Sequence, residues 1–351
     1  MQRHARAVRS FPQARISSTN AGPCVKIKNA MNSPLAPWLD QDRLLLLDGG
    51  LGTELERRGH TQLGRLWSSA LVRTNPAAIR EVHRDYLQAG ASCITTATFQ
   101  ASITTLKSAG LHQAEAEDFL RDAVALAVRE RDRFFHKHPE RLRPIVAASI
   151  GPYGASLCNG AEYTGDYRLT QRELRAFHAD RWRVLCESEA DVIAFETIPS
   201  SEEARALLSL LAATPSRQAW ISFTCRDACH LADGTPLSEI LKATQGIPNL
   251  CAVGVNCVAP RLTLRLTEKL TGLTSKPLIV YPNASNAWDL ASRKAKDETS
   301  AEVFATAAGK WRKAGASVIG GCCRTTPEHI AAMREVVGEG VKKGQLPQPM
   351  A

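Results

Sequence analysis

Residues 317–330, SVIGGCCRTTPEHI, contain one complete unit of the predicted fold. The apolar run Ser317–Ile319 predicts a short buried strand. Thr326-Pro327-Glu328 predicts the start of a helix, because proline is favoured in the first helical turn. Gly320-Gly321 and Cys322-Cys323 lie between the two elements. A strand followed at once by a helix is the building unit of α/β folds.

The same strand–helix pattern recurs along the rest of the chain. The other apolar runs are Leu44–Leu47, Cys93–Ala97, Ile145–Ser149, Val192–Phe195, Trp220–Phe223, Ala252–Val255 and Leu278–Tyr281. Helical periodicity lies between them, at Pro76–Ala89, Ala114–Phe135, Thr170–Ala190, Ser201–Ala213, Pro260–Leu270 and Ala301–Ala314. Continuous apolar strands alternating with helices indicate a parallel sheet covered on both faces. Eight units predict an α/β fold with a single (β/α)8 TIM barrel.

A doubly wound sheet is the alternative fold. It would need a glycine-rich phosphate-binding turn after the first strand. The stretch 48–53, DGGLGT, is rich in glycine, but it lacks the G-x-G-x-x-G spacing and the lysine of a P-loop. The barrel is therefore the predicted architecture.

The chain divides into one large domain and two short ends. Six basic residues precede the first acidic residue, Asp40, and supply most of the formal charge of +9. We predict a basic, disordered N-terminal extension at 1–38, the barrel at 39–340 and a C-terminal tail at 341–351. We expect a cytoplasmic protein. The alternative is the mitochondrial matrix, because transit peptides are also rich in arginine and free of acids; initiation at Met31 is a further possibility.

Composition excludes several classes of protein. No apolar run approaches the roughly 20 residues of a membrane helix. The body of the chain also lacks the dense stripe of lysine and arginine that would suggest binding of nucleic acid. Ten cysteines among 351 residues, with no apolar signal peptide, do not resemble a disulfide scaffold. We expect the partners to be small molecules. We also expect a reducing compartment, because paired cysteines there serve as metal ligands or reactive thiols.

Polar side chains follow the strands at the points where each strand ends. In a (β/α)8 barrel these C-terminal ends form the catalytic face. The residues there are Asp48, Thr98, Phe99, Gln100, Gly151, Pro152, Tyr153, Glu196, Thr224, Cys225, Asn256, Cys257, Pro282, Asn283 and Gly320 to Cys323. Segments distant in sequence are thus expected to meet on one rim.

The cysteines of this rim are the candidate metal ligands. Cys322 and Cys323 end the last strand, and Cys257 ends the sixth, so the three thiols can converge. Three thiolates with an open fourth position are typical of a catalytic zinc site. The alternative is that they are inert small hydrophobic residues. A rival metal set is Cys225, Cys229 and His230, whose spacing matches no standard zinc motif.

Asp48 and Glu196 are carboxylates at buried strand ends. Buried carboxylates are rarely left unpaired, because ionisation there is costly. They are expected to bind a cationic ammonium group or to hold protons in the pocket. A helix cap or a salt bridge is the structural alternative.

Several segments together resemble one known family. They are DGGLGTELERRG, LWSSALV, REVHRDYLQAGA, TATFQAS, IGPYGA, EYTGDY, AFETIPS, GVNC, YPNAS and GGCCRTTPEHI, in that order. From about Leu44 to Met333 the chain resembles the homocysteine S-methyltransferases. IGPYGA and EYTGDY are more similar to the branch that uses S-methylmethionine or S-adenosylmethionine than to the betaine branch.

The resemblance implies a mechanism. Zinc would bind Cys257, Cys322 and Cys323, and Asp48 and Glu196 would contact the amino group of homocysteine. Zinc coordination removes the proton of a thiol, and the homocysteine sulfur would then attack the methyl group of a sulfonium in line. No organic cofactor is needed, so catalysis would consist mainly of positioning and thiolate formation.

The resemblance also implies further substrate contacts. Asn283 is the candidate fourth zinc ligand before substrate binds, with water as the alternative. The aromatic residues Trp67, Phe99 and Tyr153 suit a sulfonium through cation–π attraction, although ordinary packing would also explain them. Thr98 is a candidate substrate contact on the same strand end. Where the family commonly reads YPNSGE, residues 281–286 read YPNASN, so Asn286 replaces the usual acid; this departure bears on amino-acid recognition and donor preference.

The expected reaction is methyl transfer from S-methylmethionine or S-adenosylmethionine to homocysteine, giving methionine. Alternatives on the same scaffold are methylation of selenocysteine or selenohomocysteine, or use of betaine. A zinc hydrolase would prefer histidine and carboxylate ligands. A non-catalytic zinc or RNA-associated protein would bind through its basic tail. The protein is expected to be a monomer or a homo-oligomer.

Overall fold

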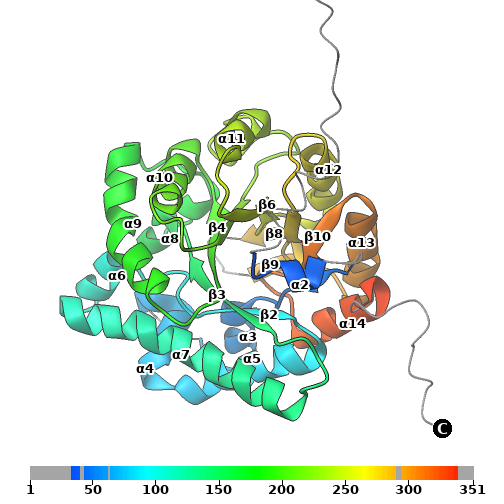
Figure 1. Ribbon diagram of the computed structural model, residues 1–351, viewed down its shortest axis with the longest axis horizontal. Helices are drawn as coiled ribbons and strands as arrows, with labels where there is room; N and C mark the ends of the chain where they lie inside the picture. The colour runs from blue at the N-terminus through cyan, green and yellow to red at the C-terminus, as the bar shows by residue number, and fades with distance from the viewer. Residues whose placement is uncertain (1–32, 40–42, 62–63, 290–293, 339–351) are drawn as a thin grey trace, which may run out of the picture.

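Eight parallel strands form a closed barrel in the computed structural model, which describes residues 33–39, 43–61, 64–289 and 294–338 (Figure 1). The strands are β1 (Leu45–Leu46), β2 (Cys93–Thr95), β3 (Ile145–Ile150), β4 (Val192–Ile198), β5 (Ala219–Phe223), β6 (Leu250–Asn256), β7 (Leu278–Tyr281) and β10 (Ala316–Ile319). Their order is β1-β10-β7-β6-β5-β4-β3-β2. A parallel bridge between Leu47 and Cys93 joins the two ends of this order. The predicted (β/α)8 barrel is therefore confirmed.

Helices surround the barrel. The longer ones are α5 (Pro76–Ala89), α7 (Gln113–Lys137), α9 (Gln171–Cys186), α10 (Ser201–Ala212), α11 (Leu237–Thr244), α12 (Pro260–Thr271), α13 (Ala301–Lys313) and α14 (Pro327–Val337). Shorter elements are α2 (Ala36–Leu39), α3 (Leu51–Arg57), α4 (Leu71–Thr74), α6 (Ile103–Ser108), α8 (Tyr153–Leu157) and the 3-10 turns η2 (Gly64–Ala70) and η3 (Ala161–Tyr163). Nowhere in the described ranges is a helix both long and apolar enough to span a bilayer.

Local sequence explains where α5 begins and ends. The side chain of Asn75 accepts a hydrogen bond from Ala78 N, and Pro76 occupies the first turn. Gly90 ends the helix with a φ of 113°, which glycine adopts without strain. These signals are all local, and the predicted range Pro76–Ala89 matches the observed helix.

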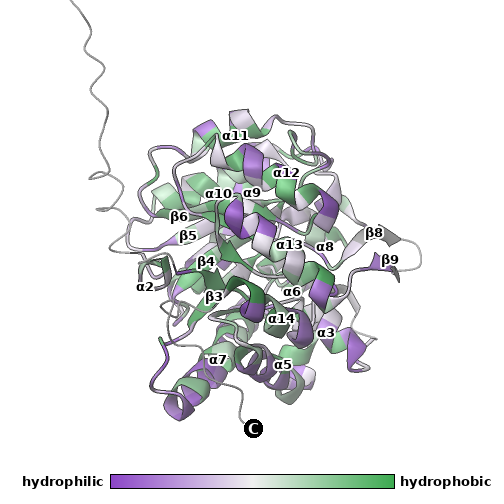
Figure 2. Cartoon of the chain, turned by 90° about the vertical axis from the view of Figure 1, so that its right-hand side faces the viewer, coloured by the Kyte–Doolittle hydropathy of each residue, from purple (hydrophilic) through white to green (hydrophobic). Residues whose placement is uncertain are grey.

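The strands separate two apolar cores. Leu45 and Leu47 belong to a cluster made almost entirely of strand residues, which fills the interior of the barrel. Leu46 belongs to a larger cluster that includes helix residues such as Val82, between strands and helices. Successive strand side chains point to opposite faces, so one continuous apolar run serves both cores. Figure 2 shows β3 and β4 as mainly hydrophobic, whereas the surrounding helices carry both hydrophobic and hydrophilic residues.

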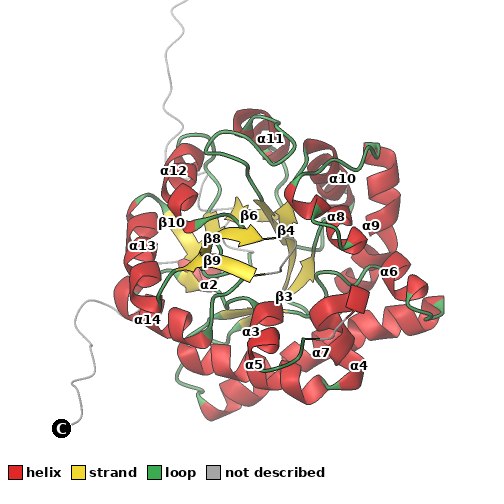
Figure 3. Ribbon diagram, turned by 180° about the vertical axis from the view of Figure 1, so that it is seen from behind, coloured by secondary structure: helices red, strands yellow, loops and turns green. Residues whose placement is uncertain are grey.

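The two ends of the barrel differ. α2 lies across one end (Figure 1), and Leu35 just before it is fully buried in the interior cluster. Part of the predicted 1–38 extension is thus packed against the barrel, whereas residues 1–32 lie outside the described ranges. An antiparallel hairpin, β8 (Ser285–Asp289) and β9 (Lys294–Glu298), lies at the opposite end (Figures 2 and 3). This hairpin was not predicted, because its sequence is polar and not alternating.

Candidate active site

A cavity of about 290 Å³ opens at the C-terminal ends of the strands. The predicted site residues that line it are Asp48, Trp67, Phe99, Glu196, Cys257, Cys322 and Cys323. Thr98, Tyr153 and Asn283 lie outside its lining. The strand-end rule therefore brings most of the predicted set together.

The three predicted metal-binding thiols converge in this cavity. The sulfur atoms of Cys257, Cys322 and Cys323 all lie within 4.8 Å of one another, and those of Cys257 and Cys323 are 3.8 Å apart. Two sulfurs on one tetrahedral zinc ion, with bonds of roughly 2.3 Å, lie about 3.8 Å apart. The geometry of the thiols thus fits a zinc ion with one position left for a further ligand.

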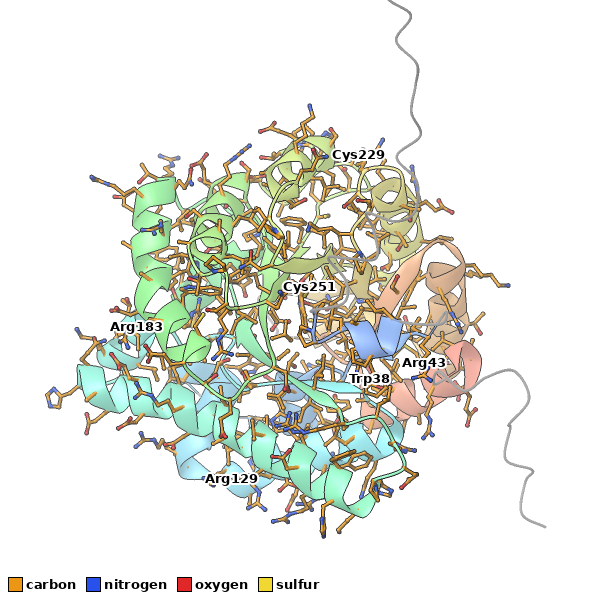
Figure 4. All side chains as sticks on the ribbon, in the orientation of Figure 1. Trp38, Arg43, Arg129, Arg183, Cys229 and Cys251 are labelled. Carbon is orange, nitrogen blue, oxygen red and sulfur yellow. The ribbon has the colours of Figure 1, made fainter. Side chains whose placement is uncertain are left out.

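The rival set of cysteines forms no such group. Within the described ranges, the only group of at least three histidine, cysteine or acidic ligands close enough for one metal is the Cys257 set. Cys229 is exposed and lies at the periphery near α11, whereas Cys251 lies at the barrel interior (Figure 4). His230 bonds through Nδ1 to Asp227 instead.

The strand order explains why these thiols meet. β6 and β10 both pair with β7, so the segments that follow them lie on either side of the end of β7. Cys257 N donates to Tyr281 O at 3.3 Å, and Cys322 N donates to Pro282 O at 2.8 Å. Cys257 adopts a φ of 53°, which is uncommon for a residue with a side chain. The end of β7 therefore holds both ligand segments by backbone hydrogen bonds.

Asn283 completes this backbone scaffold. Its side-chain Oδ1 accepts a hydrogen bond from Cys323 N at 3.1 Å, and its own N donates to Val258 O at 2.9 Å. The oxygen that was predicted to be a resting metal ligand thus contacts the backbone of Cys323. Asn286, on β8, has a side chain outside the described part of the structure.

Asn256 fixes the strand end that carries Cys257. Its Oδ1 accepts hydrogen bonds from Thr197 N at 2.7 Å and Ser222 Oγ at 2.8 Å, and its Nδ2 donates to Thr197 Oγ1 at 2.8 Å. One fully buried amide thereby joins the ends of β4, β5 and β6. The rim position of Asn256 was predicted from the sequence, but this role was not.

Asp48 and Glu196 are buried carboxylates within the cavity lining. Asp48 accepts hydrogen bonds from Thr95 N at 2.7 Å and from Thr95 Oγ1. Ser149 Oγ donates to Glu196. Burial raises the pKa of Asp48 to about 8 and that of Glu196 to about 7, despite these hydrogen bonds. A cation placed between them would relieve the cost of ionising both groups.

Trp67 and Phe99 give the cavity an aromatic wall. The ring of Trp67 lies over Gly52, where a Cβ atom would be 2.3 Å from the ring, and its Nε1 donates to Glu56 Oε1 at 2.6 Å. Gly52 therefore permits a close approach that no other residue would allow.

Tyr153 and Thr98 have structural surroundings. Tyr153 packs against Tyr167 and Phe177 at ring distances of 5.2 and 4.9 Å. Thr98 is fully buried and donates from its hydroxyl to Ser149 O at 2.7 Å. Both residues support the rim from behind the cavity lining.

Glu162 and Tyr163, on η3, are site residues that the sequence reasoning missed. Tyr163 Oη lies 3.3 Å from Cys257 Sγ, and both side chains line the cavity. They belong to the segment EYTGDY, which lies in the long connection between β3 and α9. The strand-end rule does not reach so far into a connection, so only the resemblance of this segment could have indicated it.

A buried ionic network anchors that connection. Glu203 accepts hydrogen bonds from Tyr153 N at 2.6 Å, from Tyr167 Oη and from His178 Nε2 at 2.7 Å. His178 Nδ1 accepts from Arg181 Nη2 at 2.9 Å, so the neutral ring carries its proton on Nε2. Burial lowers the pKa of His178, in agreement with a neutral ring. The network thus holds one negative and one positive charge with a neutral histidine between them.

Arg181 extends the network to two rim segments. It donates to Gly151 O at 2.7 Å and to Phe99 O at 3.3 Å. The ends of β2 and β3 are therefore held by the same buried guanidinium, which lies behind the aromatic wall of the cavity.

Comparisons with known proteins agree with this geometry. Residues 45–337 match the homocysteine S-methyltransferase family. The chain is 42% identical over 307 residues to the homocysteine S-methyltransferase of Escherichia coli K12, covering 87% of this chain and 99% of that protein. It is 41% identical over 301 residues to homocysteine S-methyltransferase YbgG of Bacillus subtilis, covering 85% and 96% of the two chains.

Solved structures lead to the same conclusion. The crystal structure of the E. coli homocysteine methyltransferase MmuM in its metallated form superposes with a TM-score of 0.79 at 41% identity, covering 86% of this chain and 99% of that one. The oxidised form superposes equally well, with a TM-score of 0.79. The chain therefore belongs to the homocysteine S-methyltransferase family and is a homocysteine S-methyltransferase.

Proposed function

We propose that this enzyme transfers a methyl group from S-methylmethionine or S-adenosylmethionine to L-homocysteine and that its metal is zinc. The convergence of the Cys257, Cys322 and Cys323 thiols, with the spacing that tetrahedral zinc requires, carries the proposal. A thiolate-only donor set favours zinc over magnesium or calcium, which prefer oxygen ligands.

The zinc site and the carboxylates have separate tasks. When bound, zinc acts as a Lewis acid that lowers the pKa of the homocysteine thiol, which is about 8.5 in a free thiol, so that thiolate is available at neutral pH. Asp48 and Glu196 bind the ammonium group of homocysteine, because both are buried in the cavity lining without a cationic partner in it. Asn283 keeps Cys323 in place through its backbone amide.

The reaction exchanges one carbon–sulfur bond for another. The homocysteine sulfur forms a bond to the methyl carbon while the bond from that carbon to the donor sulfur breaks. The bonding pair stays on the donor sulfur, which becomes neutral, and the thiol proton is released. The donor carries its own leaving group, so the protein contributes the positions of the two substrates and the thiolate.

The aromatic wall supports a sulfonium donor. Trp67 and Phe99 line the cavity, and an aromatic face attracts a cation. Trp67 is held by Glu56 and by its close contact with Gly52, so its ring is oriented before the donor binds.

One experiment tests metal and donor together. Zinc content and methionine formation are measured for wild type, Cys322→Ala and Cys229→Ala, with S-methylmethionine, S-adenosylmethionine or betaine as donor. Cys322→Ala is expected to lose both zinc and activity, whereas the exposed Cys229 serves as the matched control. Full activity in a zinc-free Cys322→Ala would contradict the role of zinc, and product from betaine alone would contradict the donor assignment.

A further inference from the structure

One carboxylate oxygen of the cavity has no hydrogen-bond partner. Glu162 Oε2 is hidden from solvent and makes no hydrogen bond within the described structure. The other lining carboxylates each have one: Asp48 from Thr95, Glu196 from Ser149 and Glu56 from Trp67. A buried carboxylate oxygen without a hydrogen-bond partner is costly. Its oxygen is therefore available to a ligand that enters the cavity.

The cavity that surrounds Glu162 has a distinctive charge. Its described lining contains four carboxylates and four cysteines but no lysine, arginine or histidine. Burial raises the pKa of Glu162 to about 7, so its ionisation is readily favoured by a nearby positive charge. A cavity lined in this way attracts cations and disfavours neutral or anionic ligands of the same shape.

Because Asp48 and Glu196 are assigned to homocysteine, Glu162 remains for the second substrate. Asp48 and Glu196 lie at the strand ends β1 and β4, within the barrel, where the proposed function places the homocysteine ammonium. Glu162 instead comes from η3, beside Tyr163, whose hydroxyl contacts Cys257. In-line transfer places the donor sulfur, the methyl carbon and the homocysteine sulfur on one line, so the donor needs a part of the cavity that homocysteine does not fill. The connection that carries η3 contributes to the cavity wall from outside the strands.

We propose that Glu162 recognises the positive charge of the methyl donor and thereby selects a cationic donor. This inference rests on the proposed methyl transfer. S-methylmethionine and S-adenosylmethionine each carry one net positive charge, and the donor loses that charge when its carbon–sulfur bond breaks. The Glu162 carboxylate therefore interacts more strongly with the donor than with the demethylated product.

Steady-state kinetics of the zinc-loaded enzyme test this role. Glu162→Gln keeps the shape of the side chain and removes its charge, and Glu162→Asp keeps the charge. Glu189→Gln, at an exposed carboxylate before β4, is the matched control. KM is measured separately for S-methylmethionine and for homocysteine, with zinc content and the urea unfolding midpoint as measures of integrity.

Glu162→Gln is expected to raise the KM for S-methylmethionine by about tenfold or more, since hydrogen bonds to charged groups are the stronger ones. Its KM for homocysteine is expected to change by less than about twofold, because a residue that contacts one substrate affects mainly that substrate. Glu162→Asp should recover part of the affinity for the donor. Glu189→Gln should match wild type.

Two results would overturn the role of Glu162. One is a donor KM in Glu162→Gln equal to that of wild type. The other is an increase in KM that indicates a structural effect, either because it is equal for both substrates or because Glu162→Asp does not reduce it. Failure of the proposed function appears elsewhere, as a wild-type enzyme that accepts only betaine. Betaine has zero net charge but carries a positive quaternary ammonium group, so the Glu162→Gln comparison can then be made with that donor.

Discussion

Tyr163 Oη lies 3.3 Å from Cys257 Sγ, although 94 residues separate the two in the chain. Tyr163 comes from the β3–α9 connection, and Cys257 comes from the end of β6. One polar contact thus joins the outer wall of the cavity to the thiols at the strand ends. Groups that hydrogen-bond to metal ligands fix their orientation and tune their basicity.

Tyr163→Phe removes this contact while it retains the ring. We expect metal affinity or kcat/KM to fall by about 10- to 100-fold, as for other hydrogen-bond partners of metal ligands. Competition with a zinc chelator gives the affinity, and methionine formation gives kcat/KM. If both stay at the wild-type values, the hydroxyl has no influence on the thiols.

Glu203→Gln removes the negative charge of the buried network. Arg181 then remains buried without its counter-charge, and the loss of one partner of a buried pair costs about 3–5 kcal/mol. Urea unfolding of the metal-loaded enzyme measures the loss, with Glu189→Gln as a surface control that should change stability by less than about 0.5 kcal/mol. A loss under about 1 kcal/mol would argue against a charged network.

Asp48 makes stability depend on pH. Its pKa is about 8 in the folded protein against an ordinary value of 3.8, because burial disfavours the charged form. Between these values the folded state holds a proton that the unfolded chain has lost. The contribution of Asp48 protonation to the free energy of unfolding is therefore complete below pH 3.8. It declines as the pH rises towards about 8, by at most about 1.4 kcal/mol per pH unit.

Asp48→Asn removes this contribution. The unfolding free energy of the variant should fall less steeply between pH 5 and 8 than that of wild type, as measured by urea titrations at several pH values. Equal slopes for the two proteins would mean that Asp48 is ionised in the folded state across this range.

Gly320→Ala should disturb the site through packing alone. A Cβ atom at Gly320 would lie 2.4 Å from Leu47 Cβ, next to Asp48 and close to the thiols. We expect a loss of about 1–3 kcal/mol from overpacking, together with reduced zinc content. Gly272→Ala is the matched control, because its Cβ would meet only Lys269 O at 3.6 Å at an ordinary backbone φ of −79°. A tolerated Gly320→Ala would show that β1 and β10 can separate slightly.

Local signals in the sequence predicted most of the barrel. The ranges of α5 and β7 agree with the predicted ones, since their patterns of capping and apolar residues are local. β4 continues to Ile198, three residues beyond its predicted end, because Glu196 and Thr197 are polar yet stay in the strand. The β8–β9 hairpin was missed because its residues show no apolar alternation that would indicate strands.

The candidate site was only partly predictable, for a geometric reason. The end of a strand is encoded by where an apolar run stops, so Asp48, Glu196 and the three thiols could be placed on one rim. The approach of Tyr163 to Cys257 depends on how a long connection folds back. The contact between Asn283 and the Cys323 backbone likewise depends on the neighbouring strand. Such contacts leave no periodic pattern in the sequence.

The pairing of β10 with β1 has a consequence for biosynthesis. Cys257 emerges from the ribosome well before Cys322 and Cys323, which follow β10. The same strand that places these two residues also makes the last contacts of the ring, with Leu45 and Leu46. A metal ion bound by all three thiols therefore cannot have its full set of ligands until β10 and the residues after it have been synthesised. Full coordination of the metal thus follows synthesis of the last strand of the barrel.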